Sequence, residues 1–313
     1  MKRLPLVLWF CIGIALVSCG GRAVNKPVPS HLTVGEKETE KGLEWYRKGC
    51  YRKALNHFFR AYELFSMSDL INGVAMSLNN LGTIHRVLGN YEDAVAAFEE
   101  SYRLYTDLED PEGAENALSN EAATFIQMGD LKNGEDTLVR AFSLSSKKTT
   151  RAPSLTLLQN QGVLLTKQGR YHESETILAT CLNQAKGLSP LEMASLHFAY
   201  GNMMLQSDRP SKAVASFEKA LSLDKQVGFF RGVAEDLSHL AEAYRQLGQT
   251  EKAVRAWQRA VKILALLDLG YEVDNTMEHL RKTASEAKIN ISITEGFVER
   301  WRQDRLYESP CEE

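Results

Sequence analysis

Three asparagines recur at forty-residue intervals along the chain, as Asn80, Asn120 and Asn160. Each falls in a stretch whose apolar residues have the spacing of one helix face, and each lies off that face. Asparagine competes with the backbone for hydrogen bonds, so it is a poor residue inside a helix unless its side chain is used. Its amide carries a donor and an acceptor, as a peptide group does. The chemistry that this row offers is hydrogen bonding to an extended chain.

The row also has a structural interpretation, in which each amide bonds the neighbouring helix and sets the packing of successive units. The sequence leaves both interpretations open. Polar and aromatic residues at nearby positions would extend the same surface. The candidate partner-binding residues are Asn79, Asn80, Thr83, Asn116, Asn120, Gln159, Asn160, Phe198 and Asn202.

The residue types of an active site do not converge anywhere in the sequence. The seven histidines are scattered, without an HExxH motif, a nucleophile elbow or a phosphate-binding loop. No Cys/His cluster has the spacing of a metal site. We therefore expect no enzyme, no cofactor and no metal ion, and no small-molecule substrate is implied.

Three cysteines remain after the first twenty residues, and they are widely spread. Cys181 stands where other copies of the repeat described below hold alanine, so we expect a buried, inert thiol. Cys50 follows a turn and could be exposed. Because Cys50, Cys181 and Cys311 are an odd number at irregular spacing, we expect no disulfide framework.

The elements that must position these residues form an internal repeat. Its turn residues are Gly49, Gly89, Gly129, Gly169, Asp208 and Gly248, at spacings of 40, 40, 40, 39 and 40. Each unit has two amphipathic segments, and the first ends at the turn, where glycine tolerates the left-handed conformation that ends a helix. The second segment alternates large and small residues, as in Tyr91, Ala94, Phe98 and Ser101. The repeat therefore predicts stacked helix pairs.

These residues resemble the tetratricopeptide repeat (TPR), and residues 78–101 match its pattern best. The resemblance implies an all-α fold: a right-handed solenoid of about six helix pairs over residues 35–273, with a degenerate capping pair in 274–313. The forty-residue period is similar to that of kinesin light chain and Pins-type scaffolds, which use such asparagines to grip peptides. The resemblance thus implies that the first helices of the pairs line a concave surface for a protein or peptide partner.

The N-terminal residues are predicted to be a targeting segment. A basic start at Lys2 and Arg3 precedes an apolar run, residues 4–17, that is shorter than the roughly 20 residues of a membrane-spanning helix. The run ends in LVSC, residues 16–19, which resembles the lipobox of bacterial lipoproteins. The resemblance implies a signal peptide over residues 1–18, lipidation of Cys19, and a tether over 19–34.

Location and charge narrow the class of protein further. Gly20 in place of aspartate favours, by analogy with lipoprotein sorting, the outer membrane of the bacterial envelope, facing the periplasm. The formal charge of −3 becomes −5 once Lys2 and Arg3 are removed, which gives no support for nucleic-acid binding. We expect a lipid-anchored, non-enzymatic scaffold. The alternative is a fixed subunit or assembly factor of a secretion, pilus or outer-membrane machine.

Overall fold

The computed structural model describes residues 30–145, 152–304 and 311, and over these residues it contains fourteen helices and no strand. The helices are α1 (Ser30–Arg47), α2 (Tyr51–Met67), α3 (Ile71–Val87), α4 (Tyr91–Asp107), α5 (Pro111–Met128), α6 (Leu131–Leu144), α7 (Leu155–Lys167), α8 (Tyr171–Gln184), α9 (Pro190–Gln206), α10 (Pro210–Val227), α11 (Phe230–Gln246), α12 (Thr250–Leu266), α13 (Gly270–Glu286) and α14 (Ser292–Asp304).

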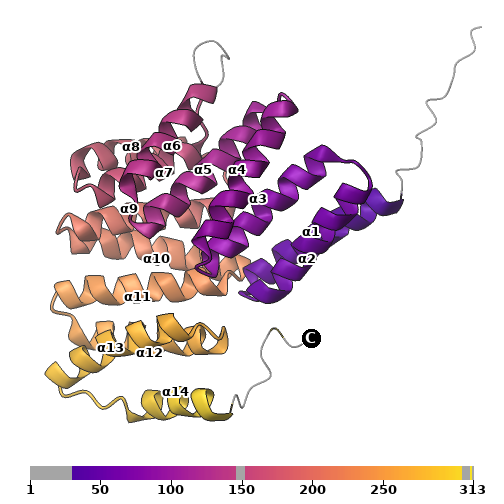
Figure 1. Ribbon diagram of the computed structural model, residues 1–313. Helices are drawn as coiled ribbons and strands as arrows, with labels where there is room; N and C mark the ends of the chain where they lie inside the picture. The colour runs from indigo at the N-terminus through magenta and orange to yellow at the C-terminus, as the bar shows by residue number, and fades with distance from the viewer. Residues whose placement is uncertain (1–29, 146–151, 305–310, 312–313) are drawn as a thin grey trace, which may run out of the picture.

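The helices stack as antiparallel pairs into a curved array (Figure 1). From α1 to α11 the odd-numbered helices also pack against one another from pair to pair, so they form the inner surface of the array. This confirms the predicted all-α solenoid with six pairs and a terminal pair. Helix α1 begins at Ser30, inside the segment 19–34 that we expected to be a tether.

The turns within the pairs have the conformation that the repeat predicts. The five turn glycines all have positive φ, from +71° at Gly248 to +84° at Gly129. Asp208 adopts φ +58° at the equivalent place, because aspartate is one of the few residues that tolerates this region. Directly after two of these turns, Asp130 caps α6 by accepting a bond from the Asn133 amide, whereas the Asn90 side chain does not cap α4.

The core within a pair is built from one large side chain set over a glycine. Phe58, Phe98 and Phe217 are at most 2% exposed. Each ring lies over a glycine of the partner helix: a Cβ added to Gly82 would come 2.8 Å from the ring of Phe98. Only glycine permits this approach, which explains why small residues recur before the turn.

The last pair covers the end of the array. Val273, Met277 and Leu280 of α13 are at most 1% exposed and pack on α12, and Val298 of α14 joins the same cluster. An open solenoid end would expose the apolar face of α12, so this pair acts as the cap that such arrays require.

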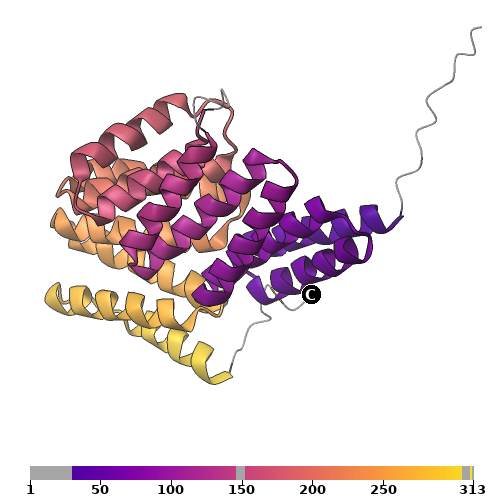
Figure 2. The same ribbon diagram turned by 45° about the horizontal axis from the view of Figure 1, so that its top comes forward.

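The first pair closes the array by contacting the sixth. Tyr46 of α1 stacks on Phe229, just before α11, with ring centroids 5.8 Å apart. Leu267, which follows α12, packs against the turn at Gly49. Figures 1 and 2 both show the α1–α2 pair beside the ends of α3 and α11. The fourteen helices therefore do not form an open spiral.

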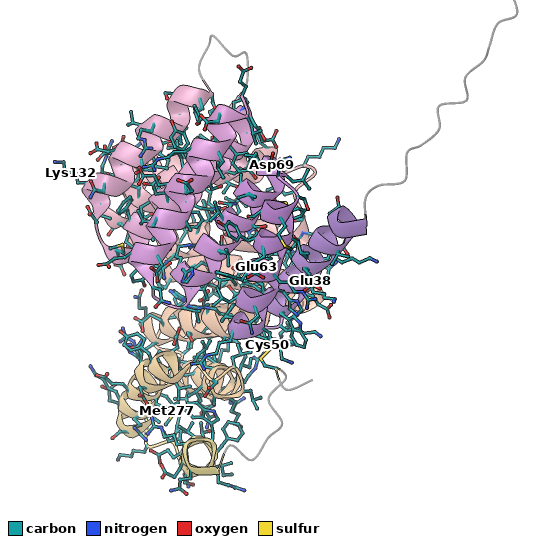
Figure 3. All side chains as sticks on the ribbon, turned by 45° about the vertical axis from the view of Figure 1, so that its right-hand side comes forward. Glu38, Cys50, Glu63, Asp69, Lys132 and Met277 are labelled. Atoms are coloured by element: carbon teal, nitrogen blue, oxygen red, sulfur yellow. A yellow bond between two sulfur atoms is a disulfide. The ribbon has the colours of Figure 1, made fainter. Side chains whose placement is uncertain are left out.

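A disulfide bond joins the first pair to the C-terminal segment that follows α14. Cys50, at the start of α2, is bonded to Cys311, 261 residues later in the chain (Figure 3). The odd number of cysteines implied no disulfide framework, and this one bond corrects that interpretation; Cys50, which could have been exposed, is buried at 2% exposure. The spacing concealed the pairing because the curvature of the array, rather than the local sequence, brings the two ends together. Cys181 is free and fully buried, as predicted.

Candidate functional site

The repeating asparagines lie on the inner surface and bond from one helix pair to the next. The Asn120 Nδ2 atom donates to Oδ1 of Asn79 at 3.0 Å, and the Asn160 Nδ2 atom donates to the carbonyl of Ser119 at 2.8 Å. Both bonds join neighbouring odd-numbered helices across 41 residues. Asn80, Asn120 and Asn160 are all half-buried. The contacts of Asn120 and Asn160 are those of the structural interpretation.

An aromatic contact continues this row in the sixth pair. His239 stands at the position that corresponds to Asn80, and its ring lies 4.7 Å from that of Phe198, measured between centroids. These two residues are again 41 positions apart. Burial lowers the pKa of His239, so its ring is neutral at pH 7 and packs as an aromatic group. At this position of the repeat, asparagine contacts the preceding odd-numbered helix by a hydrogen bond, and histidine contacts it by ring packing.

The remaining candidate residues do not form one cluster. Gln159 donates to the Ser195 hydroxyl at 2.7 Å, and the Thr83 hydroxyl bonds the carbonyl of Asn79 in its own helix. Asn116 is exposed, and Asn202 accepts a 3.4 Å bond from Gln206. Of the nine candidates, Phe198 alone lines the cavity described next.

A cavity of about 190 Å³ lies where the first pair meets α9 and α11. Its aromatic walls come from three parts of the chain: Tyr46 of α1, Phe198 of α9 and Phe229 before α11. Its acidic side is formed by Asp224 at the end of α10 and by Glu235 and Asp236 of α11. Because Tyr46 is part of the closing contact, the cavity exists only in the closed array. We call it the acidic cavity.

Asp224 and Asp236 form a buried carboxyl pair, at 5% and 1% exposed. The two groups lie close enough for each to affect the charge state of the other. Burial and the charge of Glu235 raise the pKa of Asp224 to about 7. Burial and the two neighbouring carboxylates raise the pKa of Asp236 to about 9. No donor among the described residues reaches Oδ1 of Asp224 or Oδ2 of Asp236.

Glu235, the third acid of the cavity, differs from Asp224 and Asp236 because it forms an ion pair with Arg231. Arg231 Nε donates to Glu235 at 2.7 Å, and its two other nitrogens bond the Val87 carbonyl at 3.2 Å and Glu272 at 3.3 Å. The same guanidinium lies 5.7 Å from the ring centroid of Tyr51. Arg231 therefore joins α11 to α2, α3 and α13, and all of its hydrogen-bonding nitrogens are engaged away from the buried pair.

The repeat register shows that the acidic pair replaces core residues. Sixteen positions after the turn, Asp224 stands where two other pairs hold Phe65 and Tyr105. Those rings cover Gly73 and Gly113, as Asp224 covers Gly232. Twelve positions before the turn, Asp236 stands where four other pairs hold Ser77, Ala117, Leu157 and Leu196, all at most 1% exposed, while the first pair holds the exposed Lys37.

Sequence reasoning missed this pair, although a signal was present. The turn residues fix the register, and aligning the pairs by it shows two acids at positions that are small or apolar in the other pairs, except for Lys37 in the first pair. Their proximity could not be read from one repeat, because Asp224 and Asp236 belong to different helices. Tyr46 could not be predicted at all, since it reaches the cavity through closure of the array.

Family models confirm the nature of the repeat. Two models, both described as tetratricopeptide repeat, match residues 44–107 and 153–226, and residues 237–263, which together make up more than half of the 313 residues. The chain is a tetratricopeptide-repeat protein. No curated protein matches its sequence.

Solved TPR structures share the fold at low sequence identity. The Rap conjugation gene regulator of plasmid pLS20, in complex with the Phr* peptide, aligns over 94% of this chain and 83% of its own, with a TM-score of 0.59 and 13% identity. A Rap protein complexed with Competence and Sporulation Factor aligns over 82% and 76%, with a TM-score of 0.57 and 12% identity. BtubC (BKLC) from P. vanneervenii aligns over 78% and 93%, with a TM-score of 0.50 and 13% identity.

The predicted lipid attachment residue, Cys19, and the predicted signal peptide lie outside the described residues. Across residues 30–145 and 152–304, no helix of this TPR protein combines the length and apolar character that crossing a bilayer needs. The same residues contain no group of three or more His, Cys, Asp or Glu side chains arranged to hold a metal ion.

Proposed function

We propose that the chain is a non-enzymatic scaffold, lipid-anchored in the bacterial envelope, that binds a peptide or protein partner on the inner surface of its solenoid. TPR proteins are generally interaction scaffolds, and two neighbours of the same fold were solved with a bound factor or peptide. The observation that carries the proposal is the inner surface itself, which combines exposed polar positions with a cavity that the closed array creates.

The exposed part of this surface runs along one position of the repeat. Asn116, Thr156 and Ser195 are exposed on α5, α7 and α9, and the same register position in α11 is Glu235, beside the acidic cavity. Uncharged polar groups along such a line can bond a peptide backbone of any sequence. The asparagine row behind it holds the helices in register, so the line is rigid before a partner arrives, which lowers the entropic cost of binding.

The compartment is supported by two independent features. The LVSC segment at residues 16–19 has the form of a lipobox. The Cys50–Cys311 disulfide is a bond that persists in oxidising compartments such as the periplasm and is rare in the cytosol. An anchor at Cys19, facing the periplasm from the outer membrane, accounts for both.

Metabolic labelling with a fatty acid tests the anchor. Wild-type protein should incorporate the label, and Cys19→Ser should not incorporate it and should leave the membrane fraction or remain unprocessed. Incorporation into Cys19→Ser, or none into the wild type, would reject the anchor.

Purification from native membranes tests the scaffold role. We expect partners that are sub-stoichiometric and change with growth conditions. A single stoichiometric complex would instead favour a fixed subunit or assembly factor of an envelope machine.

A further inference from the structure

We propose that the acidic cavity binds the cationic side chain, lysine or arginine, of the partner peptide, with Asp224 and Asp236 as acceptors and Tyr46, Phe198 and Phe229 as walls. The inference rests on the proposed function, because it names one chemical feature of the partner. It goes further, because it assigns a ligand class to a defined site.

The first support is the state of the two carboxyl groups. Both are more than nine-tenths buried and both line the cavity. Oδ1 of Asp224 and Oδ2 of Asp236 have no hydrogen-bond donor among the described residues. Buried acids in proteins are generally paired or hydrogen-bonded, so a donor for these two oxygens would have to come from outside the described residues.

Glu115 shows how this chain satisfies a buried acid elsewhere. It is also fully buried, and its two carboxylate oxygens accept bonds from the Ser145 hydroxyl and from the Ser154 backbone amide. Oδ1 of Asp224 and Oδ2 of Asp236 accept no such bond from the described residues. The strong base nearby, Arg231, is engaged by Glu235, Glu272 and the Val87 carbonyl.

The walls and the size indicate which donor fits. Aromatic faces attract cations, with most effect where the cation is desolvated, and three rings line the cavity. A volume of about 190 Å³ is below the roughly 300–1,000 Å³ of pockets that hold a whole small ligand. The cavity therefore suits one long side chain that ends in N–H donors, and a peptide on the adjoining line of polar residues would deliver it.

The register argues against a purely structural role. The buried equivalents of these positions hold rings, serine, alanine or leucine, which pack without burying a charge, and the first pair holds Lys37, which is exposed. Two acids at contacting core positions cost stability unless a ligand compensates them. A binding site requires two acids from different helices to lie side by side. Packing of the core does not require this arrangement.

Ligand-observed saturation-transfer NMR on the mature full-length protein tests the proposal. The probes are acetyl-Gly-Lys-Gly-amide and acetyl-Gly-Arg-Gly-amide, compared with the norleucine and citrulline peptides, which keep the length and lose the charge. We expect the cationic peptides to bind wild-type protein at least about tenfold more tightly than their neutral counterparts.

The variants are Asp224→Asn and Asp236→Asn, which are nearly isosteric, and Asp236→Leu, which restores the residue of Leu157 and Leu196. Each should abolish the preference for the cationic peptides. Glu121→Gln is the matched control: Glu121 is 4% exposed with a pKa raised by burial to about 7, yet it lies outside the cavity. It should bind as the wild type does. Circular dichroism confirms that each variant is folded.

Several outcomes would overturn the proposal. These are equal binding of the lysine and norleucine peptides, an unchanged preference in the Asp→Asn variants, or no binding of either cationic peptide up to about 10 mM. Butylamine alone binding as tightly as the lysine peptide would make the ligand a free amine instead. A partner captured equally well by wild type and by Asp236→Asn would remove this inference and leave the scaffold function standing.

Discussion

Arg231 donates a hydrogen bond to the carbonyl of Val87 at 3.2 Å, across 144 residues of sequence. The contact joins α11 to the end of α3 and is part of the closure that places Tyr46 on Phe229. A regular repeat specifies only contacts between neighbouring pairs. Closure therefore depends on a few residues that depart from the repeat, and these can be tested one at a time.

Replacing Arg231 should open the array. Its side chain is 14% exposed and contacts three partners, so Arg231→Gln leaves Glu235 and Glu272 without their cation and should cost about 3 kcal/mol of unfolding free energy. Urea denaturation gives the stability, and small-angle scattering should show a larger radius of gyration. Arg255→Gln is the control, because its ion pair with Glu251 is at least 75% exposed and is worth under about 1 kcal/mol. Equal effects of the two substitutions would show that Arg231 does not hold the closure.

The disulfide should be detectable by counting thiols in a soluble form of the mature chain. Unfolded without reductant, this form should react with iodoacetamide at Cys181 alone; with reductant, Cys50 and Cys311 should react as well. Reduction should lower stability by about 2–4 kcal/mol, since the bond closes a long loop. The native protein should resist labelling because Cys181 is fully buried. Three labels before reduction would contradict the bond.

Stability should fall as the pH rises through the neutral range. The pKa values of Asp224 and Asp236, about 7 and about 9 when folded, lie well above the unfolded value of 3.8. Between about pH 4 and 9 the folded state therefore holds more protons than the unfolded state, and the free energy of unfolding decreases with pH. The Asp224–Asp236 pair is most favourable for the stability of the fold at low pH, and it is most unfavourable above about pH 9.

Asp236→Leu isolates this effect. Relative to wild type, the variant should gain about 2–3 kcal/mol more at pH 8 than at pH 5, because it removes one of the two shifted carboxyls. A gain of this size raises the melting temperature by several degrees. Asp136→Asn, on an exposed side chain of α6, serves as the control. If the melting temperatures of wild type and Asp236→Leu differed by the same amount at every pH, the assignment would be wrong.

The asparagine row should matter for stability before it matters for binding. Asn120→Ala and Asn160→Ala each remove a bond between odd-numbered helices and should cost about 1 kcal/mol, although alanine is the better helix former. Asn116→Ala, on an exposed side chain of the same surface, should change stability by less than about 0.5 kcal/mol. The measurement is the urea midpoint of each variant. If all three behave alike, the asparagines are not structural fasteners.

The features that recur from one repeat to the next could be predicted from the sequence. Turn residues such as Gly89 and Asp208, the buried place of Cys181 and the core face of α13 all follow from local spacing, because a solenoid is built from contacts between neighbours. What it could not supply is long-range geometry. The Cys50–Cys311 bond and the Tyr46–Phe229 contact depend on curvature summed over six pairs, and small rotations per pair decide whether the ends meet.

Photo-crosslinking in native membranes tests the central claim, partner binding on the inner surface, most directly. A photoreactive amino acid at Thr156 lies exposed on inner helix α7, and one at Val139, 64% exposed on α6, lies on a helix outside that surface. The account predicts that Thr156 captures a discrete partner and that Val139 does not. Capture of the same partner from Val139, with none from Thr156, would place binding on the outer surface and contradict the account.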